Sequence, residues 1–151
     1  MAAPLFMGFD SSTQQLKALV IDKDLKVVTE ASVHFDNDFP EFKTQGGVHQ
    51  HKDKLTVTAP TLLWVKAFDL VLKRLKENGL EFGAIACVSG TGQQHGSVYW
   101  KNGARETLKN LQSGKSLYDQ FQVQGVHLCM VGALTLSCSF RTLPLFLILI
   151  N

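Results

Sequence analysis

The chain has 151 residues, enough for one domain with a hydrophobic core and too few for two ordinary domains. Hydrophobic residues make up 45% and charged residues 19%, which is typical of a globular chain and excludes a largely disordered one. Fifteen Lys and Arg against thirteen Asp and Glu leave a formal net charge of +2. That charge is too weak to favour nucleic acid or an anionic membrane surface as the partner.

The cysteines and the amino terminus indicate the compartment. Cys87, Cys129 and Cys138 are an odd number and widely spaced, which favours a reducing environment over a disulfide framework. Phe6–Phe9 runs directly into Asp10, so no charged segment followed by an apolar leader opens the chain. We therefore expect an unsecreted, cytoplasmic protein.

Two regions of the chain differ in composition. Residues 1–122 mix apolar, polar and charged positions as a folded domain does. Residues 123–151 contain one charged residue, Arg141, and no carboxylate. The sequence predicts a domain over 1–122 and a divergent apolar tail over 123–151, which would be an aggregation hazard if exposed.

Three strands are predicted at the start of the domain. Leu5–Phe9 is a short apolar run that ends at a polar turn, and Leu16–Asp22 is a second apolar run. Lys26–Phe35 alternates apolar and polar positions, the period of a half-buried strand. Successive strands joined by tight turns predict an antiparallel meander.

A long loop and one clear helix are predicted next. The loop covers residues 36–56, and the helix begins near Pro60 and is closed by Asn78-Gly79. Residues at 4-3-4 spacing share the helix face expected to be buried, and lysines occupy the face expected to contact water. The buried set is Trp64, Phe68, Val71 and Leu75, and the exposed set is Lys66, Lys73 and Lys76.

The remaining elements complete an α/β pattern. Ala84–Ser89 is a near-continuous apolar run, which predicts a strand buried on both faces and parallel to an earlier one. Ser97–Trp100 is a further short strand, and Ala104–Gln122 is weakly helical. Three antiparallel strands followed by a helix and a parallel strand place the chain in the α/β class.

The first candidate motif is the turn Asp10-Ser11-Ser12-Thr13-Gln14-Gln15, which ends near Lys17. Small hydroxyl residues at a hairpin tip let backbone N–H groups approach phosphate oxygens. A carboxylate at a strand end can hold Mg²⁺, and a following lysine can neutralise phosphate charge. An ordinary polar turn explains the same residues, because Asp and Ser favour turns for local reasons.

The second candidate motif is the glycine-rich segment Ser89–Gly96, immediately after the predicted parallel strand. Open α/β sheets place ligand sites at the carboxyl ends of their strands. Gln93, Gln94 and His95 offer donors and acceptors suited to hydroxyl groups, and therefore to a sugar. A flexible glycine loop with an exposed His95 is the alternative.

Four segments, taken together, resemble the eukaryotic xylulose kinases of the FGGY carbohydrate kinase family. They occur in the family's order and span roughly the first four-fifths of the chain. The segments are GFDSSTQQLKALVID, VHFDNDFPEFKTQGGVHQHKD, LTVTAPTLLWVKAFDLVL and VSGTGQQHGSVYW.

The resemblance implies an actin-like ATPase fold of the ribonuclease H-like type, of which this chain would be an incomplete N-terminal domain. It also implies transfer of the ATP γ-phosphate to the 5-hydroxyl of D-xylulose. The implied nucleotide-binding residues are Asp10, which would also lie beside Mg²⁺, and Ser11, Ser12, Thr13 and Lys17; the implied sugar-binding residues are Gln94 and His95. The family usually has a glycine where Ser12 stands, so the phosphate-facing turn departs from the pattern at that position.

Features that the family uses for catalysis are missing from the 151 residues. The catalytic base of the family is the aspartate of a Gly-Asp-Asn segment, and a Trp-x-Asp pattern contacts the sugar, but neither occurs here. The adenosine pocket belongs to the family's C-terminal domain. Phosphoryl transfer depends on positioning and on charge neutralised from both sides of the nucleotide. We therefore expect no catalytic residue in this chain and no turnover from the chain alone.

Other motifs indicate less. Ser113-Gly114-Lys115-Ser116 is not a P-loop, because Lys109 stands where that motif needs a glycine. His49 and His51 lack the further ligands of a metal site and fit a solvated loop better. The apolar tail Val126–Ile150 is interrupted by Arg141 and Pro144, which disfavours a membrane span.

Two functions from other classes remain as alternatives to an enzyme fragment. One is a non-catalytic regulatory module that pairs with a full-length kinase. The other is a membrane protein anchored by its C-terminal tail.

Overall fold

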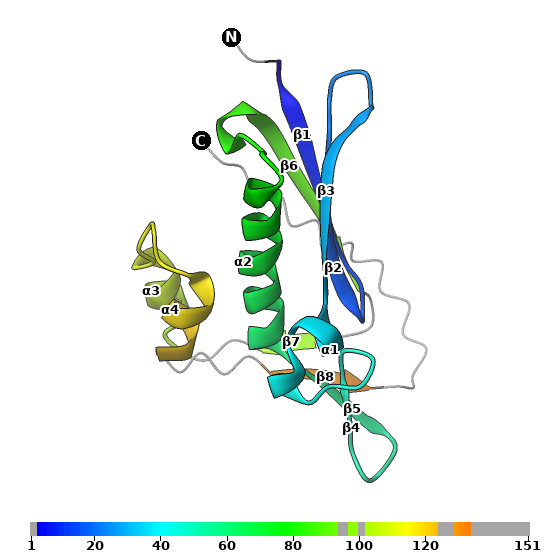
Figure 1. Cartoon of the computed structure of the whole chain (residues 1–151). Coiled ribbons are helices and arrows are strands. Elements are labelled where there is room, and N and C mark those ends of the chain that lie inside the picture. Colours follow the sequence, from blue (N-terminus) through cyan, green and yellow to red (C-terminus); the bar gives the residue numbers. More distant parts are fainter. Residues whose placement is uncertain (1–2, 94–96, 100–101, 124–128, 134–151) are drawn as a thin grey trace, which may run out of the picture.

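A computed structural model of the chain describes residues 3–93, 97–99, 102–123 and 129–133. In this part, one four-stranded sheet lies alongside a long helix, and a second four-stranded sheet lies at the N-terminal end of that helix (Figure 1). The first sheet has the order β3-β2-β1-β6, formed by β1 Leu5–Ser11, β2 Gln15–Ile21, β3 Val27–His34 and β6 Ile85–Gly92. The second has the order β4-β5-β8-β7, formed by β4 His49–Gln50, β5 Thr56–Pro60, β8 Cys129–Ala133 and β7 Ser97–Tyr99. The helices are α1 Phe35–Asp38, α2 Thr61–Glu77, α3 Ala104–Lys109 and α4 Leu117–Val123, with short 3-10 turns η1 Pro40–Phe42 and η2 Phe82–Ala84.

The antiparallel meander predicted from the sequence is confirmed. Strand β2 pairs antiparallel with β1 on one side and with β3 on the other. The carboxylate of Asp22 closes the turn between β2 and β3 by accepting hydrogen bonds from the backbone N–H groups of Asp24 and Lys26. Local polar chemistry therefore fixes this turn, as the sequence pattern indicated.

Helix α2 begins and ends where the sequence predicts. It follows Pro60 and closes before Gly79, whose φ of +86° allows the backbone to leave the helix. Trp64 and Phe68, predicted for the buried face, are only partly buried. The fully buried side chains of α2 are Leu63, Ala67, Val71 and Leu75. The apolar face is wide because α2 packs against the first sheet and also against α4.

The prediction that the three helix lysines contact water holds only in part for Lys66, whose side chain is 33% exposed. Its ammonium lies 5.1 Å from the ring centroid of Phe39, 5.9 Å from that of Phe42 and 5.2 Å from that of Tyr118. It also pairs with the carboxylate of Glu41. Aromatic faces attract a cation, so Lys66 joins η1 and α4 to α2. Lys73 and Lys76 are exposed as predicted.

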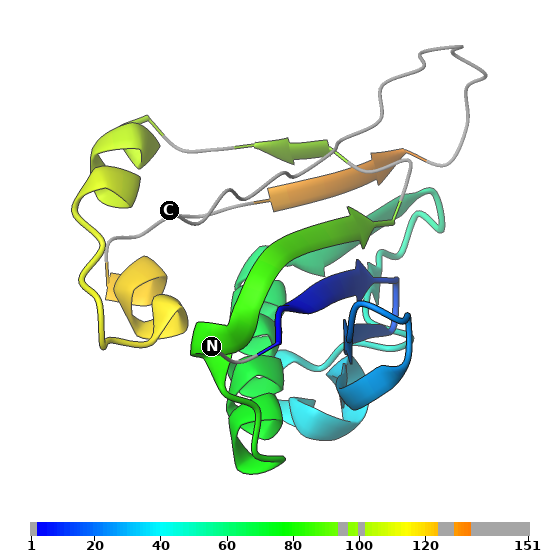
Figure 2. The same cartoon turned by 90° about the horizontal axis from the view of Figure 1, so that it is seen from above.

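The hydrophobic core lies between α2 and one face of the first sheet. Seen from above, α2 lies along one side of β1 and β6, while α3 and α4 stand beside the helix, away from this sheet (Figure 2). Side chains alternate between the two faces of a strand, so every second residue of β2 is buried. The buried residues that the meander and α1 contribute are Met7, Leu16, Ala18, Val20, Val33 and Phe35.

The prediction for the strand after α2 is half right. Strand β6 is parallel to β1, as expected, but it is not buried on both faces. It lies at the edge of the sheet with β1 as its neighbour, and Ala86, Cys87 and Ser89 are exposed. It also continues through Gly92 into the segment that the sequence indicated as a loop, because its pairing with β1 extends to Ser11.

The second sheet was not predicted. Residues 36–56 were expected to form a loop, yet they contain α1, η1 and β4, and β5 follows at once. Strand β8 falls inside the predicted tail 123–151 and pairs with β5 and β7. Trp100, the last residue of the strand predicted over Ser97–Trp100, lies outside the described residues. Apart from β8, so does the tail Val126–Ile150, and the domain boundary proposed at residue 122 therefore stays a prediction. Among the described residues, no helix combines the length and the apolar character needed to cross a bilayer.

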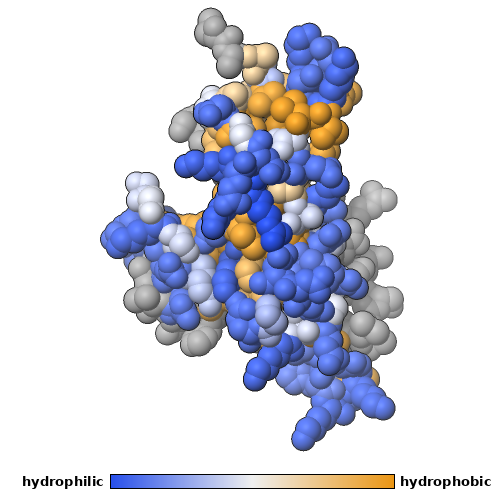
Figure 3. All heavy atoms as spheres, viewed as in Figure 1, coloured by the Kyte–Doolittle hydropathy of each residue, from blue (hydrophilic) through white to orange (hydrophobic). Residues whose placement is uncertain are grey.

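Polar and apolar surfaces separate along the first sheet. Leu25, Val27 and Val28, near the turn between β2 and β3, are exposed. In Figure 3, apolar surface gathers near the upper end of the molecule, next to a hydrophilic cluster, and the lower end is mostly hydrophilic. The tip of the β1–β2 hairpin lies toward the lower end (Figure 1).

An ion pair fastens α2 to the end of the meander. The Arg74 guanidinium donates to both carboxylate oxygens of Asp38, at 2.5 and 3.2 Å, and also to the carbonyl of Ser32. Asp38 accepts a further hydrogen bond from the backbone N–H of His34 at 2.7 Å. The Arg74 hydrogen bonds, followed by that from His34, hold the pKa of Asp38 below its ordinary value, although partial burial opposes them.

This arrangement predicts a dependence of stability on pH. A carboxylate whose pKa is lower in the folded state stabilises the fold above its unfolded pKa of about 3.9. That contribution disappears as the pH falls through the folded pKa. We expect the free energy of unfolding, measured by urea denaturation, to fall from about pH 5 downward. The slope should be shallower in Asp38→Asn, and equal slopes for variant and wild type would contradict the ion pair.

Candidate active site

The hairpin formed by β1 and β2 carries the first group of predicted site residues. Asp10 and Lys17 are register partners on adjacent antiparallel strands, so their side chains stand on the same face of the sheet. The turn between the strands is closed by Ser12, whose N–H and Oγ donate to the carbonyl of Gln15 at 3.0 and 3.2 Å. Asp10 and Thr13 are exposed. A carboxylate, hydroxyl groups and an ammonium therefore gather at one end of one hairpin.

The parallel pairing of β1 with β6 brings the second motif to the same place. Asp10 lies beside Thr91 and Ser11 beside Gly92 in the register of the two strands. The backbone N–H of Gln93 donates to the carbonyl of Ser11 at 2.9 Å. The glycine-rich segment thus leaves the sheet directly beside the hairpin tip. Gln94 and His95 lie outside the described residues.

Lys17 already has an anionic neighbour. Its ammonium lies 2.9 Å from the carboxylate of Glu30 on β3, and both side chains are about half exposed, at 44% and 55%. An exposed pair of this kind contributes about 0–1 kcal/mol. A phosphate group can therefore replace or share this partner at little energetic cost.

The donor set fits Mg²⁺ held mainly by a nucleotide and water. Asp10 offers one exposed carboxylate at the end of β1. In the described part of the chain, no three His, Cys, Asp or Glu side chains gather as a metal cluster. Mg²⁺ commonly keeps several waters and takes one or two protein carboxylates together with substrate phosphates. Asp10 matches the protein's share of such a site.

Two segments, at Phe35 and at Gly47, pack against the tip of the β1–β2 hairpin and support it. This contact was not predicted from the sequence. The Phe35 N–H donates to the carbonyl of Gln14 at 2.9 Å. Gly47 lies so close that a Cβ on it would be 2.0 Å from the carbonyl oxygen of Thr13. The adjacent glycines of the sequence were the available signal, because paired glycines mark turns with positive φ.

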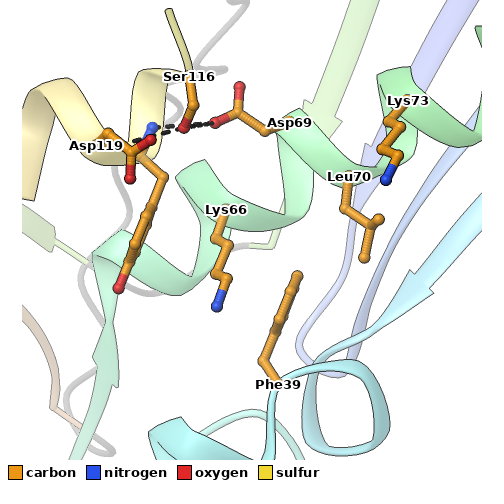
Figure 4. Close-up of a pocket in the computed structure, with 8 residues that line it drawn as sticks. Phe39, Lys66, Asp69, Leu70, Lys73, Ser116 and Asp119 are labelled. Carbon is orange, nitrogen blue, oxygen red and sulfur yellow. Dashed lines mark hydrogen bonds between the residues drawn. The ribbon is translucent and has the colours of Figure 1, made fainter.

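A hollow of about 420 Å³ lies elsewhere, between α2, η1 and the start of α4 (Figure 4). Asp69 on its wall accepts hydrogen bonds from the Ser116 hydroxyl at 2.9 Å and from the Tyr118 N–H at 3.0 Å. Lys66 is held by Glu41 and the surrounding rings. These polar groups attach α4 to α2, so the hollow marks a packing interface between helices. It lies apart from the β1–β2 hairpin and the glycine-rich segment.

Known proteins share both the sequence and the fold of this chain. No family model matches it. The xylulose kinase of Rattus norvegicus is 54% identical over 116 residues, which are 77% of this chain and 22% of the rat protein. Xylulose kinase 2 of Arabidopsis thaliana is 45% identical over 139 residues, which are 89% of this chain and 25% of the plant protein.

Among solved structures, the "xyloylose kinase" of Brucella ovis matches with a TM-score of 0.53 and 24% identity, over 65% of this chain and 18% of that chain. The chain therefore spans about a fifth to a quarter of the length of the relatives it matches. Over most of its length, the chain is similar in sequence to part of the xylulose kinases, and its described residues share part of the actin-like ATPase fold of FGGY sugar kinases.

Proposed function

We propose that the chain supplies one wall of the active site of a carbohydrate kinase that transfers the ATP γ-phosphate to the 5-hydroxyl of D-xylulose. The observation that supports this most directly is the meeting of two motifs at one end of the sheet, with the Gln93 N–H bonded to the Ser11 carbonyl. Relatives named xylulose kinases support the choice of sugar. We assign the reaction to the cytoplasm on the cysteine usage of the sequence.

Each residue of the hairpin has a proposed role toward the nucleotide. The hydroxyls of Ser11 and Thr13 and backbone N–H groups of the turn bind phosphate oxygens. Ser12 shapes the turn for this contact, because its N–H and Oγ donate to the Gln15 carbonyl. Lys17 neutralises phosphate charge, and Asp10 holds Mg²⁺. The bound ion would screen the charge on the phosphate oxygens as the phosphoryl group is transferred.

The glycine-rich segment has the corresponding role toward the sugar. It begins beside the hairpin, where Gly92 is the register partner of Ser11. We propose that Gln94 and His95 bind hydroxyl groups of D-xylulose. The catalytic base remains unassigned, since the 151 residues contain no Gly-Asp-Asn segment.

Binding is the readout that tests this proposal. In a ¹⁵N-labelled chain, MgATP should shift the amide signals of residues 11–15, and D-xylulose should shift those of Gln94 and His95. Lys17→Met should weaken MgATP binding on the order of 3–10-fold, the effect of one exposed charge worth about 1 kcal/mol. Asp10→Asn should remove the dependence of nucleotide binding on Mg²⁺.

Lys23→Met is the matched control for Lys17→Met. Lys23 is also exposed and also pairs with a carboxylate, that of Asp24 at 3.1 Å, but it lies beyond the opposite end of β2. Its substitution should leave the affinity for MgATP unchanged. Equal losses in the two variants, or nucleotide-induced shifts confined to other parts of the chain, would contradict the proposed site.

A second candidate function is a non-catalytic module that pairs with a full-length kinase, and the two edges of the first sheet favour it. At the β3 edge, α2 covers the strand, since Arg74 donates to the Ser32 carbonyl and Asn78 to the Glu30 carbonyl at 3.1 Å. Among residues 3–93, 97–99, 102–123 and 129–133, no strand pairs with the other side of β6, which has exposed side chains. An uncovered edge strand is a template for pairing with another chain.

Sedimentation with a full-length xylulose kinase tests this second candidate. The chain should sediment with the kinase, and Cys87→Lys on β6 should abolish the complex because a charge on an edge strand opposes pairing. Val28→Lys, an exposed position on β3, should leave it intact. Independent sedimentation of the wild-type chain would rule out the pairing function.

A further inference from the structure

We infer that Asp36 and the Gly46-Gly47 turn are a positioning device that fixes the phosphate-facing hairpin from behind. The inference rests on the proposed function, because it assigns a role in phosphate binding to residues that would not touch the nucleotide themselves. Two observations support it. The backbone at Gly47 lies very close to that at Thr13, and the carboxylate of Asp36 accepts hydrogen bonds from the Gly46-Gly47 turn.

The turn that approaches the hairpin depends on glycine at two consecutive positions. Gln45 and Val48 form an isolated antiparallel bridge, with the Gln45 N–H donating to the Val48 carbonyl at 2.9 Å. The two residues between them, Gly46 and Gly47, have φ of +62° and +79°. Two successive positive φ values are those of a type I′ turn, which glycine adopts at the least cost.

The approach to the hairpin uses one of these glycines. A Cβ on Gly47 would lie 2.0 Å from the Thr13 carbonyl oxygen and 3.0 Å from Cδ2 of Phe35. A Cβ on Gly46 would meet only the flexible amide of Gln14, at 3.8 Å. The Thr13 carbonyl therefore lies directly against Gly47, and the lack of a side chain there permits that contact.

The orientation of the Thr13 carbonyl determines where the next N–H points. A trans peptide is planar, so its C=O and N–H point in opposite directions. Because the Thr13 carbonyl faces Gly47, the N–H of Gln14 points away from the turn. The Gln14 carbonyl is also fixed, because it accepts a hydrogen bond from the N–H of Phe35. The support from Gly47 thus keeps the Gln14 N–H directed away from the Gly46-Gly47 turn, and we infer that this N–H is a further donor for a phosphate at the hairpin tip.

Asp36 holds the turn in this position. Its Oδ1 accepts from the Thr44 hydroxyl at 2.6 Å and from the Gly47 N–H at 3.1 Å, and its Oδ2 accepts from the Gly46 N–H at 2.6 Å. The Thr44 hydrogen bond, together with those from the two glycines, holds the pKa of Asp36 below its ordinary value. Asp36 adjoins Phe35, so one short segment bonds both the turn and the hairpin.

Accurate placement of the donors is the expected benefit. Displacement of a binding group by about 1 Å can cost on the order of 100-fold in a reaction that depends on positioning. Groups that fix the neighbours of a binding residue therefore contribute to affinity without contacting the ligand.

Two glycine-to-alanine variants of the 151-residue chain separate positioning from general stability. Gly47→Ala and Gly46→Ala both place alanine at positive φ, so both should lower the melting temperature by a similar backbone effect. Only Gly47→Ala directs a methyl group at the Thr13 carbonyl. We expect it alone to shift the amide signals of Thr13 and Gln14 and to weaken MgATP binding by about tenfold, the effect of misplacing one donor to a charged phosphate.

Asp36→Asn provides a second route if Gly47→Ala fails to fold. It keeps the size of the side chain but places an amide NH₂ where one carboxylate oxygen accepted a hydrogen bond. Hydrogen exchange of the Gly46 and Gly47 amides should accelerate. The affinity for MgATP should fall, as it should in Gly47→Ala.

The outcomes distinguish this inference from the proposed function. Equal hairpin shifts and equal affinities in the two alanine variants would overturn the positioning role. So would an Asp36→Asn variant with unchanged exchange and affinity. If the wild-type chain bound no MgATP while Gly47→Ala still displaced the hairpin signals, the proposed phosphate site would fail, whereas the mechanical support of the hairpin by Gly47 would stand.

Discussion

The parallel pairing of β1 with β6 is the constraint on which the candidate site depends. It aligns Asp10 with Thr91 and Ser11 with Gly92, and it ends in the bond from the Gln93 N–H to the Ser11 carbonyl. Parallel strands end at the same edge of a sheet, so two motifs separated by most of the domain meet there. Without this pairing, the hairpin would be an ordinary polar turn and the glycine-rich segment an isolated loop.

The rest of the fold maintains that pairing. The chain between the two strands contains the meander and α2, and α2 buries its apolar side against the same sheet. The Arg74–Asp38 pair fastens α2 near the end of β3. Behind the hairpin, the turn at Gly47 supports the Thr13 carbonyl. The sheet therefore brings the motifs together, the core fixes the sheet, and the turn orients the hairpin tip.

Local signals in the sequence were enough to predict the meander and α2, because period-two alternation and the Asn78-Gly79 stop act within a few residues. The second sheet depends on β5 meeting β8 far along the chain, which no local pattern indicates. The apolar run of β6 indicated burial, but composition does not specify which neighbours a strand has. The constraint on Gly47 arises only when folding places Thr13 beside it.

The hydrogen bond between Gln93 and Ser11 offers the most direct test of the account. Nuclear magnetic resonance can detect scalar coupling across a hydrogen bond, between the amide nitrogen of one residue and the carbonyl carbon of the other. The account predicts a measurable coupling for this pair and slow exchange of the Gln93 amide. Rapid exchange of that amide without coupling would show that the two motifs do not meet, and it would contradict the proposed site.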